Sequence, residues 1–249
     1  MHSTTTLASK PARPRAAEFY RTNRGGGLYS EAVSQRAGAV VALIADRLGL
    51  SPTALTLTNL AIGFTTSITL VALAGPVAAG SVPAWAAGLV GLLGWQLAYV
   101  LDCADGQLAR VTGQGSPAGA RVDVLCDVAT QVGLATALSA TAVAQRPGTP
   151  IWLITVFAGS LLVNLMTSVL QSGPSAASMV PSTSLPVRLI KLVRDYGAIT
   201  AAVGLVLVFA PQHTVWAIVV LTVVNGGFLL ASIAFAARAA LRSTPGSSA

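Results

Sequence analysis

Charge is what this 249-residue sequence has least of, since Asp, Glu, Lys and Arg together make up only 9% of it. A soluble domain carries about 25% charged residues, so the composition excludes an ordinary water-soluble globule and a disordered chain. Cysteine is nearly absent as well, and only two cysteines exclude a disulfide-rich scaffold. Hydrophobic residues instead make up 53% of the chain, and the mean hydropathy is +0.71. This composition is typical of an integral membrane protein.

Uncharged runs divide the chain into candidate membrane spans, each of which needs about 20 apolar residues to cross a bilayer. Residues 48–101 contain no charge, and a Gly/Pro/Ser cluster at 75–83 divides them into two spans. Residues 196–237 are also uncharged and divide at Pro211. Two further spans are expected at 118–142 and 150–171. The sequence therefore predicts an all-α integral membrane protein with six transmembrane helices.

The basic residues predict the orientation of these spans, because Lys and Arg concentrate in cytoplasmic segments. With six spans and an inside N-terminus, 14 of the 15 Lys and Arg residues fall on the inner side, and only Arg146 falls outside. Trp85, Trp152 and Trp216 then each begin an even-numbered span at its outer end, where interfacial aromatic residues are expected. Both termini are therefore predicted to lie inside, with the protein in the inner (plasma) membrane.

Four segments follow from these patterns. Residues 1–27 are polar and basic, and we expect them to form a flexible tail. Residues 28–48 place apolar side chains at helical spacing among charged ones, which predicts an amphipathic juxtamembrane helix on the inner membrane surface. The six-helix transmembrane domain is expected over 49–239, and a C-terminal tail over 240–249.

Four of the eight acidic residues lie in one 26-residue stretch, where helical spacing places them on two faces. The first face holds Asp102, Asp105, Gly106, Ala109 and Arg110, and the second holds Gly119, Asp123 and Asp127. A Gly/Pro-containing break at 113–117 allows the two helices to fold back against each other. Both faces are therefore expected to line one pocket near the inner membrane surface. The other acids are expected at solvent or at the membrane interface: Glu18, Glu31, Asp46 and Asp195.

Crowded carboxylates repel one another inside a membrane unless cations neutralise them. Hard divalent cations prefer carboxylate oxygens, and Mg²⁺ commonly combines a few of them with water and phosphate oxygens. The lack of a nearby His argues against zinc or copper. Four acids can hold two metals, an arrangement that clamps a phosphoryl group during displacement. Small residues alone would indicate close helix packing, but packing does not require four acids on facing stripes.

This stretch resembles the CDP-alcohol phosphotransferase (CDP-alcohol phosphatidyltransferase) family. The family signature is D-x-x-D-G-x-x-A-R, about eight residues, and then G-x-x-x-D-x-x-x-D. Residues 102–110 and 119–127 match every specified position, with eight residues between them. The six expected spans, the inside termini and the surface helix also agree with the family from about residue 28. The resemblance implies a transferase of phospholipid biosynthesis whose catalytic domain covers 49–239.

The resemblance also implies a role for each motif residue. Asp102, Asp105 and Asp123 would ligate two Mg²⁺ or Mn²⁺ ions, and Asp127 would contact the second metal and act as general base on the acceptor hydroxyl. Gly106, Ala109 and Arg110 would line the site of the CDP moiety. The remaining candidates for nucleotide binding are the hydroxyls of Ser116, Thr53 and Thr56, although Ser51 or Thr53 could equally cap a helix.

The identity of the two substrates stays open at the level of sequence. Most bacterial relatives transfer a phosphatidyl group from CDP-diacylglycerol to a small polar alcohol and release CMP, and we expect this reaction. The reverse arrangement, a soluble CDP-alcohol reacting with a lipid acceptor, is an alternative. Arg121, Arg188, Lys191 and Arg194 could contact a phosphorylated acceptor or anionic lipid. A transporter that uses its carboxylates to carry protons or cations is a hypothesis of another class. The family also implies a homodimer.

Overall fold

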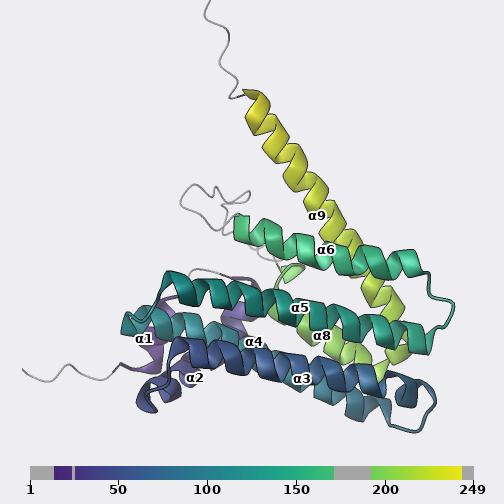
Figure 1. The fold of residues 1–249 in the computed structure, drawn as a ribbon, viewed down its shortest axis with the longest axis horizontal. Coiled ribbons are helices and arrows are strands. Elements are labelled where there is room, and N and C mark those ends of the chain that lie inside the picture. The colour runs from purple at the N-terminus through teal and green to yellow at the C-terminus, as the bar shows by residue number, and fades with distance from the viewer. Residues whose placement is uncertain (1–13, 24–25, 171–191, 243–249) are drawn as a thin grey trace, which may run out of the picture.

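The computed structural model describes residues 14–23, 26–170 and 192–242, and all the regular structure in them is helical. The N-terminal elements are α1 (Ala16–Arg21), the short π-helix η1 (Ser30–Ser34) and α2 (Gln35–Arg47). The long helices are α3 (Pro52–Ala78), α4 (Ala84–Thr112), α5 (Pro117–Gln145), α6 (Ile151–Leu170) and α9 (Thr214–Arg242). Between the last two lie the shorter α8 (Tyr196–Phe209) and the 3₁₀ turn η2 (Pro211–His213). Figure 1 shows this succession.

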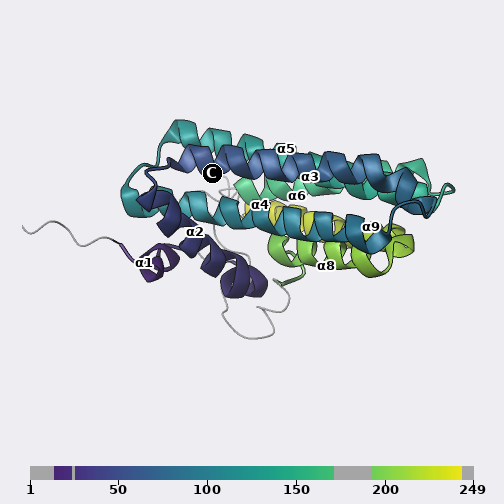
Figure 2. The ribbon, with the colours of Figure 1, turned by 90° about the horizontal axis from the view of Figure 1, so that it is seen from below.

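The helices α3, α4, α5 and α8 run side by side along the long axis of the molecule (Figures 1 and 2). Helix α3 packs against both α4 and α5, and α4 packs against α8 on its other side. Helix α6 lies over α5 and contacts the first part of α9, whose second half projects away from the bundle. The N-terminal helices α1 and α2 gather at the end of the bundle that holds the α4–α5 turn.

Local sequence explains where the helices that carry the acidic motif begin and end. Helix α3 begins with Pro52 after Ser51, whose side chain accepts a hydrogen bond from the backbone of Ala54. Helix α5 likewise begins with a proline after a serine N-cap. Proline suits the first helical position because its missing N–H has no intrahelical partner there. Helix α4 ends at Thr112 and is capped by Gly113, whose φ of 69° is the left-handed conformation that glycine adopts without strain. The turn between α4 and α5 is therefore encoded locally.

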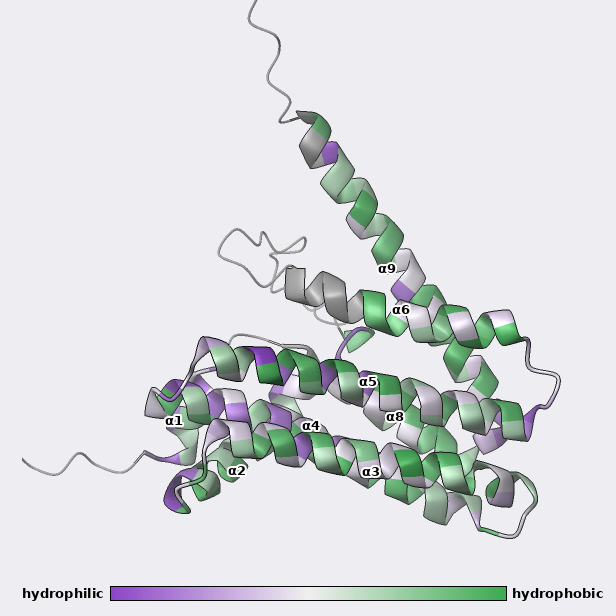
Figure 3. Cartoon of the chain, in the orientation of Figure 1, coloured by the Kyte–Doolittle hydropathy of each residue, from purple (hydrophilic) through white to green (hydrophobic). Residues whose placement is uncertain are grey.

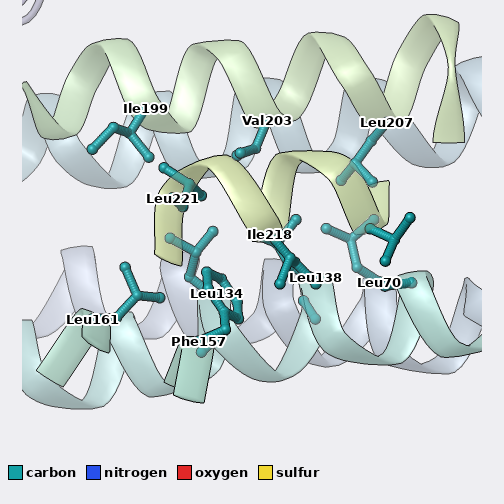
Figure 4. Packing of buried hydrophobic residues seen from close by; sticks show 14 of the residues in the cluster. Leu70, Leu134, Leu138, Phe157, Leu161, Ile199, Val203, Leu207, Ile218 and Leu221 are labelled. Atoms are coloured by element: carbon teal, nitrogen blue, oxygen red, sulfur yellow. The ribbon is translucent and has the colours of Figure 1, made fainter. Parts of the chain in front are cut away.

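The main hydrophobic core lies where α5, α6, α8 and α9 meet. Figure 4 shows Leu134 and Leu138 of α5 facing Ile218 of α9, with Phe157 of α6 beneath them. Trp95 of α4 is buried in the same cluster, and its indole N–H donates a hydrogen bond to the Ser67 hydroxyl. Large side chains from six helices are buried in this cluster, since Leu70 of α3 also belongs to it, and their burial holds the bundle together.

Four helical segments are long and apolar enough to cross a membrane: Pro52–Ala78, Ala84–Thr112, Pro117–Gln145 and Pro211–Arg238. Two further apolar segments are shorter, namely Ile151–Val163 within α6 and the whole of α8. Figure 3 shows apolar residues along the bundle and a concentration of polar ones at the end near α1 and α2. The all-helical fold with membrane-spanning helices is confirmed. The count of six spans and the inside position of both termini stay predictions.

The segment expected to lie on the membrane surface is helical over η1 and α2, and its two faces differ. Small residues such as Ala39 and Ala42 are buried against α4, whereas Val40 and Ile44 are about half exposed, at 49% and 50%. This exposed apolar face is what an interfacial helix requires. Most of the expected N-terminal tail (1–13), the basic residues Arg188 and Lys191, and the C-terminal end (243–249) lie outside the described residues.

Candidate active site

The acidic motif occupies the facing ends of α4 and α5, which the turn at Gly113 joins. Asp102, Asp123 and Asp127 each offer a carboxylate oxygen, and these three oxygens all lie within 4.8 Å of one another. Helical periodicity and the α4–α5 turn together bring these residues to one place, as the spacing predicts. Three carboxylates at this separation could hold a cation between them.

Asp105 lies outside this trio and has its own partner. Its Oδ2 accepts a hydrogen bond of 2.5 Å from the Thr56 hydroxyl of α3, and the side chain is 5% exposed. A second residue of α3, Asn59, donates its amide to Asp102 Oδ1 at 3.4 Å. Helix α3 therefore supports two of the four carboxylates. The sequence analysis included Thr56 but missed Asn59, whose signal was the one amide side chain in a span of apolar and hydroxyl residues.

The donor set fits a divalent cation. The Oδ1 atom of Asp123 is buried and makes no hydrogen bond within the described residues. Burying a carboxylate oxygen without a hydrogen-bond partner costs free energy. Coordination of a metal ion by that oxygen would offset this cost. The carboxylate trio offers the hard oxygen ligands that Mg²⁺ and Mn²⁺ prefer.

A cavity of about 280 Å³ opens on one side of the carboxylates, between α3, α4 and the start of α5. Asp105, Asp123 and Gly119 line it, together with all the sequence candidates for nucleotide binding: Thr53, Thr56, Gly106, Ala109, Arg110 and Ser116. A Cβ atom at Gly106 would come within 3.0 Å of Arg110 Nη1, so glycine leaves room for that guanidinium. The Ser116 hydroxyl accepts the backbone N–H of Gly119 at 3.0 Å, so it caps α5 at the cavity wall. We call this space the first cavity.

A second cavity of about 210 Å³ lies on the other side of the carboxylates. Asp102 and Asp127 line it, so the four acids are divided between the two spaces. Its polar lining comes from α3, α4, α5, the start of α8 and the turn just before it: Asn59, Tyr99, Thr130, Gln131, Arg194 and Tyr196. Most of these residues are isolated polar positions within apolar helices. Their shared surface depends on how four helices pack, which sequence spacing alone does not reveal.

Arg194 brings a positive charge to the second cavity. Its guanidinium lies over the ring of Phe228 of α9, 3.3 Å from the centroid, which is a cation–π arrangement. Burial lowers the pKa of Arg194, but an arginine side chain starts so high that it stays charged at neutral pH. The second cavity therefore combines a cation with the carboxylates of Asp102 and Asp127.

Asp195 corrects one expectation, because the sequence reading placed it at solvent or at the membrane interface. It is only 4% exposed and caps α8, accepting hydrogen bonds from the backbone of Gly197 and Ala198. It also accepts the backbone N–H of Ser30 at 2.8 Å, across 165 positions of sequence. The carboxylate is buried because donors from two distant segments satisfy it, which no local pattern reveals.

The order of these features along the chain matches a known family. A model of the CDP-alcohol phosphatidyltransferase family matches residues 49–225, which is 177 of the 249 residues and includes the whole acidic motif. The chain belongs to this family. A comparison with curated proteins gives no match.

Membership in the CDP-alcohol phosphatidyltransferase family establishes the class of reaction and confirms the resemblance of the motif. Family members are membrane enzymes that transfer a phosphoryl-alcohol group from a CDP-alcohol to an alcohol acceptor, generally with divalent metal ions. The chain is therefore a transferase of substituted phosphate groups, and its cluster of aspartates suits the metal dependence of the family.

Proposed function

We propose that this enzyme transfers a phosphatidyl group from CDP-diacylglycerol to a polar alcohol, with release of CMP. The observation that carries the proposal is the division of the four motif carboxylates between two cavities. Asp105 and Asp123 face the first cavity, and Asp102 and Asp127 face the second. A two-substrate transfer needs two spaces that meet at the reacting phosphorus, and the carboxylates mark that meeting point.

The first cavity is assigned to the CDP part of the donor. Gly106, Ala109 and Gly119 present almost no side chain there, so a flat nucleotide can approach the helices closely. Arg110 lines the same space, where a guanidinium can pair with phosphate oxygens. The alternative donor, a soluble CDP-alcohol, would place the same nucleotide in the same cavity. An assay must therefore show whether the lipid is the donor or the acceptor.

Asp102, Asp105, Asp123 and Asp127 would hold two Mg²⁺ or Mn²⁺ ions. When bound, divalent ions neutralise the diphosphate and stabilise the charge that develops during in-line displacement. The buried Asp123 oxygen and the carboxylate trio support this assignment. Thr56 and Asn59 hold Asp105 and Asp102 through hydrogen bonds, which is the supporting role that residues behind metal ligands commonly have.

The second cavity is assigned to the acceptor alcohol, with Asp127 as the general base. Asp127 takes the hydroxyl proton, the alcohol oxygen forms a bond to the β-phosphorus, and the bond from that phosphorus to CMP breaks. A carboxylate suits this role because no histidine lines either cavity among the described residues. Arg194 favours an acceptor that carries an anionic group, such as a phosphorylated alcohol.

The setting of the reaction is proposed on the same basis. Six spans with both termini inside would place the acidic ends of α4 and α5 at the cytoplasmic face of the inner (plasma) membrane. The exposed apolar face of α2 would lie on that surface beside the site. We also propose a homodimer, which the family implies.

The test is CMP release by purified protein in lipid or detergent. CDP-diacylglycerol is supplied with Mg²⁺ or Mn²⁺ and a panel of alcohols, namely glycerol 3-phosphate, inositol 1-phosphate, serine and phosphatidylglycerol. We expect metal-dependent release with a phosphorylated alcohol and none in EDTA. Glycerol, which carries no charge, is run as a further acceptor, and release with glycerol equal to that with glycerol 3-phosphate would contradict the role given to Arg194. Silence across the panel in folded protein would overturn CDP-diacylglycerol as donor, and CDP-alcohols would be assayed next.

Two controls make the result specific to the site. Asp127→Asn keeps the size of the side chain and removes the base, so we expect folded protein with at least a hundredfold lower kcat, within the usual range for loss of a general base. Full activity of that variant would refute the assignment of Asp127. Proton or cation flux through the protein in vesicles, with no CMP release from any donor, would support a transporter instead.

A further inference from the structure

The N-terminal segment is tied to the wall of the second cavity by a chain of buried polar groups. Ser30 of η1 is 2% exposed and donates its hydroxyl to Asp195 Oδ1, while its backbone N–H donates to Oδ2 of the same carboxylate. On its other side, the Ser30 hydroxyl lies 2.7 Å from the hydroxyl of Tyr99 in α4. Three residues far apart in sequence therefore form one relay, Tyr99–Ser30–Asp195.

Hydrogen counting fixes the direction of this relay. A serine hydroxyl has a single hydrogen, and Ser30 gives it to a carboxylate that can only accept. The hydrogen between Ser30 and Tyr99 must therefore come from Tyr99. The phenol hydrogen is thereby held toward Ser30, and it does not pair with the catalytic carboxylates of Asp102 or Asp127.

The anchored ring forms part of the wall of the second cavity. Tyr99 and Tyr196 both line that cavity, and their rings meet edge to face with centroids 5.2 Å apart. The backbone behind them is close, because a Cβ atom at Gly197 would lie 2.8 Å from the Tyr99 ring. Gln96, one turn before Tyr99, donates hydrogen bonds to the Gly197 carbonyl and to the Thr200 hydroxyl. The ring is thus packed on one face and anchored at its hydroxyl, and the other side borders the cavity.

We infer that Asp195, acting through Ser30, fixes the Tyr99 ring as one wall of the acceptor site, so that the N-terminal segment sets which alcohols fit. The inference rests on the proposed function in assigning the second cavity to the acceptor. Tyr99 is then a specificity-determining residue, and Ser30 and Asp195 are positioning residues. The relay does not touch the first cavity, so donor binding is independent of it.

The experiment compares Ser30→Ala, Tyr99→Phe and the double variant with the unmodified enzyme. Tyr99→Phe keeps the ring and removes the anchor, and Ser30→Ala removes the same anchor from the other end. We expect each to raise the KM for the acceptor about five- to tenfold, the usual effect of losing one buried hydrogen bond. The double variant should show the same increase as either single variant, while kcat and the KM for CDP-diacylglycerol stay within about twofold of their original values. Discrimination between glycerol 3-phosphate and inositol 1-phosphate should fall.

Two matched variants control for loss of a hydroxyl elsewhere. Thr141→Val removes a buried hydroxyl that donates to the Ala137 carbonyl within α5, and Ser81→Ala removes an exposed hydroxyl from the α3–α4 turn. Neither residue contacts the relay or either cavity, so acceptor KM should be unchanged. The inference would be overturned if the increases in acceptor KM caused by Ser30→Ala and Tyr99→Phe multiply in the double variant, or if donor KM and acceptor KM increase equally. Either result would indicate a general loss of packing in place of one shared hydrogen bond.

A measurement without catalysis keeps the relay testable if the proposed function fails. Thermal unfolding of the same four proteins gives a double-mutant cycle, and residues that share one hydrogen bond show coupling. Coupling between Ser30 and Tyr99 supports the relay, whereas additive destabilisation contradicts it. Silence of the unmodified enzyme with every donor and acceptor would count against the proposed function alone.

Discussion

Asp105 differs from the other three motif carboxylates in being held by a hydroxyl from a neighbouring helix. The Thr56 side chain donates to Asp105 Oδ2 at 2.5 Å in a site where both residues are buried. Such a bond fixes the carboxylate in one orientation before a cation arrives. The sequence predicts Thr56 as a candidate for nucleotide binding, and its hydrogen bond to Asp105 gives it a second role in support of a proposed metal ligand.

Thr56→Val tests this role, because valine keeps the shape of threonine and removes the donor. We expect the Mg²⁺ concentration for half-maximal CMP release to rise about tenfold, since loss of a group behind a metal ligand commonly weakens metal binding by this much. Thr56→Ser restores the hydroxyl and should restore the metal requirement. The role of Thr56 is refuted if Thr56→Val lowers activity at an unchanged Mg²⁺ requirement.

At the scale of elements, the contact between α4 and α8 depends on glycine. A Cβ atom built on Gly88 of α4 would lie 2.3 Å from the backbone nitrogen of Val208, and one on Gly204 of α8 would lie 2.8 Å from Leu92 of α4. Backbone atoms cannot move aside as a flexible side chain can. The two helices can therefore approach this closely only with glycine at the contact.

Gly88→Ala should push α4 and α8 apart and lower the thermal unfolding temperature in detergent. Overpacking of this kind costs about 1–3 kcal/mol, which outweighs the gain of about 1 kcal/mol in helix propensity. The matched control is Gly159→Ala in α6, where a Cβ atom meets nothing within 4 Å among the described residues. That control should leave stability unchanged or slightly higher. Equal unfolding temperatures for the two variants would contradict the close packing of α4 on α8.

The helices that carry the site differ in how well the sequence predicts them. The acidic faces of α4 and α5 follow from helical periodicity, and the turn between them follows from Gly113 and the serine–proline start of α5, so local signals were enough. Asp195 was misplaced because its burial depends on Ser30, 165 positions away. Helix α8 has 14 residues and a length of roughly 21 Å. Helix α8 begins directly after the buried cap Asp195. The uncharged run from residue 196 does not indicate that this start is buried.

At the scale of the whole molecule, the asymmetry of charge decides how the bundle would sit in a bilayer. Fourteen of the 15 basic residues fall on one side of a six-span arrangement, and Arg146, between α5 and α6, is the exception. Trp85, Trp152 and Trp216 lie at or near the starts of α4, α6 and α9, and all are exposed. Charge and aromatic position therefore favour the same orientation, which predicts that the acidic site lies at the cytoplasmic side.

Single cysteines in three turns test this orientation in intact cells. Ser81→Cys in the α3–α4 turn and Gly148→Cys in the α5–α6 turn should react with a membrane-impermeant maleimide in spheroplasts. Gly115→Cys in the α4–α5 turn should react only in inside-out vesicles. The unmodified protein is the control, because the native Cys126 is buried and Cys103 partly so. Labelling of Gly115→Cys from outside would contradict the predicted topology. It would place the acidic site away from the cytoplasm, where CDP-linked donors and phosphorylated alcohols are expected.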